Sequence, residues 1–196
     1  VMYDDALVAR LGPATAAMDC RDRYALVSDA FACAAAGYGD TASALSLLLA
    51  FTGETAENVT SLMSHKVGDV QSLLYAEPED VQKRLSRYAL ALFGPMAARV
   101  GMDPKDSDSH ADAMLRPMLV GRAGKLGAPE VVAECKARFA KFIGGDDKAV
   151  HPDIRGAVYS VVLKHGGKAE FDSLIALYDR LEAQDEKVAV LRSLGS

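Results

Sequence analysis

Apolar residues recur every three or four positions along most of the chain, which is the spacing of one face of an α-helix. The clearest example lies in the middle of the chain, at Val81, Leu85, Tyr88, Leu92 and Met96. Together with caps and glycine or proline breaks, this spacing predicts nine helices. One helix ends at Gly37, one is capped by Asp40, one has Pro78 in its first turn and one is opened by Pro129. The other five cover 57–74, 107–126, 153–164, 169–181 and 185–194.

Strand patterns are nearly absent, with no sustained apolar–polar alternation and no Asn-Gly or Asp-Gly hairpin pair. The expected fold class is therefore all-α. Breaks such as 37–39, 127–129 and 166–167 are short, so consecutive helices should pack antiparallel. Such helix pairs fit a stacked HEAT- or armadillo-like α-solenoid, with a compact orthogonal helical bundle as the alternative.

A chain of 196 residues has the size of one large domain, so we expect a single α-helical domain over 1–196. Residues 1–4 are a candidate for the end of a preceding β-domain, and Val1 in place of Met suggests a segment of a longer polypeptide. No apolar run approaches the ~20 residues that cross a bilayer, so no membrane partner is expected.

Charge and cysteine content narrow the function classes further. The formal net charge is −5, whereas general nucleic-acid binders carry a basic excess, so no nucleic-acid partner is expected. The three cysteines are odd in number and far apart, at Cys20, Cys33 and Cys135. This pattern argues against a disulfide framework and favours a reducing compartment, the cytoplasm.

No catalytic or metal-binding motif is present. The four histidines are His65, His110, His151 and His165, and His-Glu-x-x-His does not occur. The stretch 121–126 resembles half of a phosphate-binding loop, but it lacks the Ser or Thr after Lys125 and a preceding strand. It is better explained as a helix C-terminus, and we expect no catalytic residue, metal or cofactor in this chain.

The last third of the chain carries a family resemblance. Its ordered features are a Pro-Asp-hydrophobic-Arg start at 152–155, a Val-Tyr pair at 158–159, a Gly-Gly turn at 166–167 and a Glu-Lys-x-x-x-Leu-x-x-Leu-Gly ending at 186–195. These resemble the C-terminal helical domain of the puromycin-sensitive type of zinc aminopeptidase, a gluzincin. Weaker matches over 22–37, 54–55, 92–103 and 110–127 follow in the same order. The chain departs from the family pattern at Thr60 and Met102, near which family members have Trp.

The resemblance implies a non-catalytic domain of an enzyme that removes N-terminal residues from peptides. In the family this domain forms a wall of the substrate chamber, while zinc and the Gly-Ala-Met-Glu-Asn stretch belong to a catalytic domain absent here. The implied partners are that catalytic domain and the peptide. The alternative function is a stand-alone helical-repeat adaptor for protein interaction. An array that stops at Ser196 should leave Val188, Leu191 and Leu194 partly uncovered and able to self-associate.

The resemblance also implies contact with the far end of the peptide, whose C-terminal carboxylate would suit a guanidinium. The motif singles out no one residue for this role. The candidates are Arg84, Arg87, Arg116, Arg122 and Arg155. For each of them, solvation or pairing with a nearby acid is the structural alternative.

Overall fold

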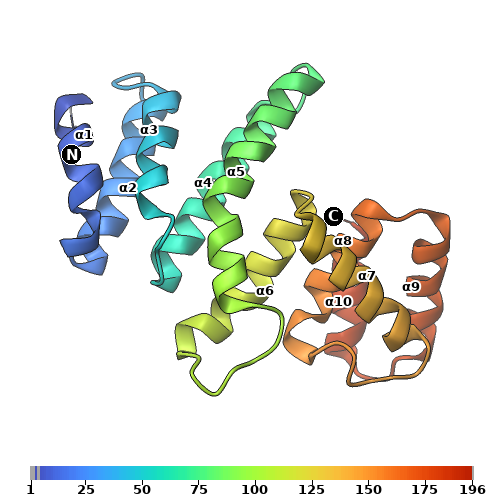
Figure 1. The fold of residues 1–196 in the computed structure, drawn as a ribbon. Helices are drawn as coiled ribbons and strands as arrows, with labels where there is room; N and C mark the ends of the chain where they lie inside the picture. Colours follow the sequence, from blue (N-terminus) through green and yellow to red (C-terminus); the bar gives the residue numbers. More distant parts are fainter. Residues whose placement is uncertain (1–2, 4, 196) are drawn as a thin grey trace. The chain divides into compact units, whose positions relative to one another are not determined.

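The computed structural model describes residue 3 and residues 5–195, and within them it contains helices and no strand (Figure 1). The all-α prediction is confirmed. Residues 1, 2 and 4, part of the segment predicted to end a β-domain, lie outside the described residues, and Tyr3 is not in a strand. The α-helices are α1 (Asp5–Ala14), α2 (Cys20–Ala35), α3 (Thr41–Leu48), α4 (Glu57–Leu73), α5 (Glu79–Val100), α6 (His110–Lys125), α7 (Pro129–Ile143), α8 (Arg155–His165), α9 (Lys168–Arg180) and α10 (Gln184–Leu194). Short 3₁₀ turns cover Thr15–Ala17, Leu49–Phe51 and Pro152–Ile154.

The helices form two compact units, Val1–Met96 and Ala97–Ser196, and α5 runs through the division between them. In the described part of the chain, no helix is both long and apolar enough to span a bilayer. The expectation of one domain, and the choice between a solenoid and a bundle, stay predictions.

Several helix ends follow the sequence signals directly. The Asp40 carboxylate accepts the backbone N–H of Ser43 at 2.7 Å, confirming it as the cap of α3. Pro129 opens α7 as predicted, since its missing N–H would have no partner in a first turn. Gly37 has a φ of +77°, a conformation that glycine adopts without steric cost, in the turn that follows α2.

Other boundaries differ from the prediction. Helix α1 was not predicted, because its Gly12-Pro13 pair is a breaker signal, yet Pro13 lies inside the helix. Pro78 precedes α5 rather than lying in its first turn, and its carbonyl accepts the N–H groups of Val81 and Gln82.

The sixth helix begins later than predicted and, as predicted, continues through its proline. It starts at His110 instead of residue 107, because Ser109 and Asp112 form a reciprocal capping box. Pro117 does not end α6, which runs on to Lys125.

In the first unit, α2 packs against both α3 and α4. The core consists of fully buried apolar side chains from these helices. They include Leu26, Val27, Phe31, Leu47, Leu48, Val59, Met63 and Val67.

In the second unit, α8 packs against α6, α7 and α10, and most of its apolar side chains are buried. Tyr159, 2% exposed, lies in this core with its ring centroid 6.1 Å from that of Phe139 and 6.2 Å from that of Phe142. Val158 and Val162 of α8 share the cluster with Val190 of α10. The run of buried residues on α8 explains why this helix has the weakest amphipathic pattern in the unit.

Two glycines let α6 lie unusually close to α8. A Cβ atom added at Gly121 would lie 3.4 Å from the Cβ of Ala157, and one added at Gly124 would lie 2.4 Å from Cγ2 of Val161. Because 121 faces 157 and 124 faces 161, the two helices run parallel. The glycine-rich stretch considered as a phosphate loop is therefore a helix–helix contact.

We expect Gly124→Ala to lower the free energy of unfolding by about 1–3 kcal/mol, because its methyl group overlaps Val161. Gly156→Ala is the control: it also adds a methyl group inside a helix of this contact, but at 3.9 Å from the Cβ of Ala189, so it should be neutral or stabilising by up to ~1 kcal/mol. Urea titration measures both. Equal stability of Gly124→Ala and wild type would contradict this packing, and Val161→Ala in the Gly124→Ala background should recover part of the loss.

Candidate functional site

The five candidate arginines lie in both units. Arg84 and Arg87 are exposed on α5 in the first unit. Arg116 and Arg122 lie on α6, and Arg155 begins α8. The partners of each side chain indicate which of them is available to a ligand.

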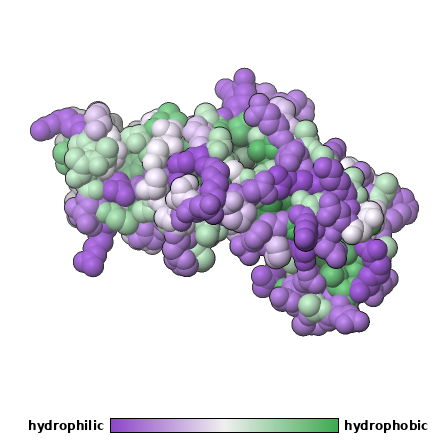
Figure 2. All heavy atoms as spheres, turned by 60° about the horizontal axis from the view of Figure 1, so that its bottom comes forward, coloured by the Kyte–Doolittle hydropathy of each residue, from purple (hydrophilic) through white to green (hydrophobic). Residues whose placement is uncertain are grey.

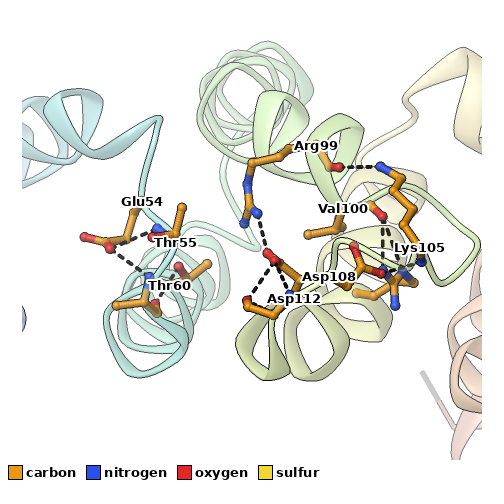
Figure 3. Close-up of polar contacts among 11 residues, drawn as sticks. Glu54, Thr55, Thr60, Arg99, Val100, Lys105, Asp108 and Asp112 are labelled. Atoms are coloured by element: carbon orange, nitrogen blue, oxygen red, sulfur yellow. Dashed lines mark hydrogen bonds and ion pairs between the residues drawn. The ribbon is translucent and has the colours of Figure 1, made fainter.

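Arg116 is buried and serves the structure of the second unit. Its side chain is 2% exposed, and it donates twice to the Val100 carbonyl at 3.3 Å, near the end of α5. It also forms an ion pair with Asp108. These bonds attach the loop over 101–109 to the end of α5 and the middle of α6 (Figure 3).

Arg155 has a similar role at the start of α8. It forms an ion pair with Glu186 of α10 and donates to the carbonyls of Val150 and Asp147 at 3.4 and 3.3 Å. Its guanidinium carbon lies 4.8 Å from the centre of the Phe142 ring, a cation–π arrangement. The side chain therefore joins α10, α7 and the loop before α8.

The remaining three arginines differ from one another. Arg84 pairs with Asp80 one turn earlier on α5, at 2.9 Å and in an exposed position. Arg87 is exposed, and no ion pair to it is found among the described residues. Arg122 is partly buried, and this burial lowers the pKa of its guanidinium.

A buried ion pair in the first unit was not predicted. Glu54, 6% exposed, accepts hydrogen bonds from the Arg23 side chain at 2.7 and 2.9 Å. It also accepts the backbone N–H groups of Thr55 and Ala56 at 2.9 and 2.8 Å, just before α4 (Figure 3). Burial alone would raise the pKa of Glu54, but the guanidinium and the two N–H groups hold it below its ordinary value. The family resemblance covers 54–55, but the sequence carries no sign that Glu54 has a partner 31 residues away.

The loop over 101–109 is held by further carboxylates. Asp112 pairs with Arg99 and accepts from Ser109, which lowers the pKa of Asp112 to about 2 (Figure 3). Asp103 accepts two hydrogen bonds from Arg138 of α7, at 2.5 and 2.6 Å, and its pKa is also lowered. This polar network fixes the loop to α5, α6 and α7.

Metal-ligating residues do not gather in the described part of the chain, where no three His, Cys, Asp or Glu side chains are placed to hold an ion. His165 Nε2 lies 2.8 Å from the Gly124 carbonyl and so belongs to the contact between α6 and α8. Burial raises the pKa of the Cys135 thiol to about 12, which makes it a core residue rather than a nucleophile.

The two positions that lack the family's tryptophan are both part of the packing. Thr60 is fully buried, and its hydroxyl donates to the Ala56 carbonyl at 2.9 Å. Met102 is partly buried against the core of the second unit. Smaller or more flexible side chains therefore fill these places.

The described residues form an all-helical domain in which arginine–carboxylate pairs join the elements of each unit. The family model described as ERAP1-like C-terminal domain matches residues 1–196. The chain therefore belongs to the ERAP1-like C-terminal domain family, as the resemblance from the sequence predicted.

The relatives are aminopeptidases by name. Aminopeptidase 2 of Candida albicans is 33% identical over 195 residues, which are 98% of this chain and 21% of the relative. Aminopeptidase M1-A of rice is 30% identical and Aminopeptidase M1 of Arabidopsis thaliana 31%, each match covering 100% of this chain and 23% of the relative. The chain thus spans about a fifth of the length of the curated relatives it matches.

We expect Glu54→Gln to lower the free energy of unfolding by about 3 kcal/mol, because it leaves Arg23 without its charged partner at a buried site. Arg84→Gln, which breaks an exposed ion pair, should change stability little and serves as the control. Chemical denaturation measures both, and an equally small effect of the two substitutions would contradict the assigned role of Glu54.

Acid should weaken the loop over 101–109. The folded pKa of Asp112 is depressed, so the stability it contributes is present above the ordinary Asp pKa of about 4 and is lost as pH falls through about 2. Asp112→Asn should therefore destabilise the domain at pH 7. Below pH 2 the stability difference between wild type and the variant should disappear. Thermal unfolding across pH checks this, and a difference between the two proteins that stays constant from pH 7 to pH 2 would refute it.

Proposed function

We propose that this domain forms a non-catalytic wall of the substrate chamber of a zinc-dependent aminopeptidase that removes N-terminal residues from peptides. The observation that carries the proposal is the match of the whole chain to the ERAP1-like C-terminal domain, together with relatives named aminopeptidases of which it covers about a fifth. The stand-alone adaptor is the less favoured alternative, because that coverage places the matched segment inside larger named enzymes.

The zinc belongs, in this proposal, to a catalytic domain of the same polypeptide, and the polypeptide works in the cytoplasm. That domain and the peptide substrate are the partners of the helical domain. The intact polypeptide should hold one zinc ion and cleave aminoacyl fluorogenic substrates, whereas the 196-residue chain should do neither. Stoichiometric zinc in the isolated chain, with hydrolysis, would overturn the proposal.

Among the five arginines, we assign the peptide's C-terminal carboxylate to Arg87. Arg116 and Arg155 are engaged by Asp108 and Glu186, and moving either would break contacts within the second unit. Arg84 is exposed but has Asp80 beside it. Arg87 keeps an exposed guanidinium that can give both oxygens of a carboxylate a hydrogen bond.

Self-association through the last helix is a further part of the proposal. Leu191 is 49% exposed, and Val188 and Leu194 are partly buried. Elsewhere on the surface, apolar side chains form separate patches among hydrophilic ones on the face drawn in Figure 2. An apolar contact between copies would remove Leu191 from water.

We expect the chain to bind a fluorescent peptide with a free C-terminal carboxylate, and amidation of that peptide to weaken binding about tenfold. Arg87→Gln should cause a similar loss for the free peptide and no further loss for the amidated one. Arg84→Gln, one turn away on the same exposed helix, is the control and should bind like wild type. Fluorescence anisotropy gives these affinities, and equal binding of the two peptides by wild type would exclude a carboxylate site.

A further inference from the structure

A pocket of about 230 Å³ lies between the N-terminal halves of α8 and α10, two helices that pack against each other in the second unit. Its polar lining comes from both helices and consists of Arg155, Tyr159, Asp185 and Glu186. The rest of its wall is proline and alanine. Since a single buried water needs only ~15 Å³, the pocket has room for a small organic group.

The Tyr159 hydroxyl is the feature of this pocket that packing does not explain. Tyr159 is 2% exposed, and its ring packs against Phe139 and Phe142. Within the described residues, however, its hydroxyl has no hydrogen-bond partner, although buried tyrosine hydroxyls usually find one. The oxygen is not sealed inside the core, and Tyr159 lines the pocket, so the hydroxyl faces the pocket's interior.

This hydroxyl can both donate and accept a hydrogen bond. Burial raises the pKa of Tyr159 to about 12, so the hydroxyl keeps its proton at neutral pH. A neutral phenol offers one O–H donor and an oxygen that accepts. A polar molecule in the pocket would therefore find a hydrogen-bond partner there.

The charges that line the pocket sum to a negative value, with two carboxylates against one guanidinium. Arg155 is offset by its ion pair with Glu186, and it also donates to the carbonyls of Val150 and Asp147. Asp185 is exposed, and over the described ranges no cation pairs with it. This balance favours a cationic ligand over an anionic one.

Helix stabilisation explains only part of this arrangement. Asp185 and Glu186 lie in the first turn of α10, where acidic side chains interact favourably with the helix dipole. That interaction needs neither a pocket nor a buried hydroxyl without a partner. A metal ion is a poor match, because no three His, Cys, Asp or Glu side chains are placed to hold one in the part of the chain that the structure describes.

We propose that this pocket binds a primary ammonium group, supplied by a lysine side chain or by a small free amine. An ammonium has three N–H donors and no acceptor, which suits the oxygen atoms of Tyr159, Asp185 and Glu186. Its aliphatic stem would lie against the proline and alanine of the wall. The bound group would give the Tyr159 hydroxyl a partner and balance the charge of Asp185.

Two probes represent the two sources of an ammonium group. N-acetyl-lysine amide stands for a lysine side chain, because both ends of its backbone are neutral, and cadaverine stands for a free amine. At low ionic strength a bound probe should shift the backbone amide NMR signals of α8 and α10, and added salt should weaken its binding. The probe with the lower Kd identifies the source.

Two further derivatives test the chemistry of recognition. N-acetyl-norleucine amide has the aliphatic stem without the charge, and the trimethyl-lysine derivative has the charge without N–H donors. Both should bind at least about tenfold more weakly than N-acetyl-lysine amide. Equal binding by either derivative would overturn the assignment to a primary ammonium.

Conservative substitutions test the site itself. Tyr159→Phe removes only the hydroxyl and should weaken binding of N-acetyl-lysine amide about tenfold. Tyr178→Phe is its control, because Tyr178 lies on α9 and does not line the pocket. Asp185→Asn should also weaken binding, and Asp179→Asn, which removes the same charge from an exposed position on α9, should not.

The stability of Tyr159→Phe separates a ligand-binding role from a structural one. Because the hydroxyl has no partner in the fold, the variant should keep the wild-type Tm or exceed it. A clear loss of Tm relative to Tyr178→Phe would show that the hydroxyl serves the fold and would overturn the proposal.

The remaining outcomes are equally direct. Weaker binding in the two pocket variants, with wild-type binding in both controls, supports the site. No shift of the α8 and α10 signals with either amine at tens of millimolar would overturn it. Neither result bears on the aminopeptidase proposal, because its peptide experiment depends on Arg87 in the first unit and on a C-terminal carboxylate that both amines lack.

Discussion

The close contact of α6 with α8 is the constraint on which much of the second unit depends. Gly124 brings the two backbones together at Val161, and α8 then presents its remaining buried side chains to α7 and α10. A residue with a side chain at 124 would push α8 outward, away from the partners that cover Tyr159 and Val158. The same contact sets the relative direction of the two helices.

Much of the secondary structure could be predicted from the sequence, because caps and breaks act locally. Asp40 and Pro129 begin helices through groups within three residues, and the apolar spacing along α5 needs no tertiary information. Helix α1 could not, since it contains Pro13, a residue whose local cost in a helix disfavours one in any short window of sequence.

The site was harder to predict than the fold. The five arginines looked equivalent in sequence. In the structure Arg116 is buried, with hydrogen bonds to a carbonyl and an ion pair with a carboxylate, while Arg87 is exposed. The difference depends on residues distant along the chain, such as the carbonyl of Val100 16 positions earlier. Glu54 was missed for the same reason, because its partner Arg23 lies 31 positions earlier, on α2. Pairing across the fold, rather than residue type, decides which charge serves structure and which is available to a ligand.

The loop over 101–109 is attached mainly by ions, and this gives it a distinct response to solvent. Residues 103–107 are exposed, and the loop is held by Arg116, Arg138 and Lys105 through carboxylates and carbonyls. Detaching residues 103–107, which are already exposed, would uncover little apolar surface, so urea, whose effect scales with the surface exposed, should promote this opening only weakly. Salt and acid act on the charges themselves. The loop is therefore expected to open in response to ionic conditions that leave the apolar cores closed.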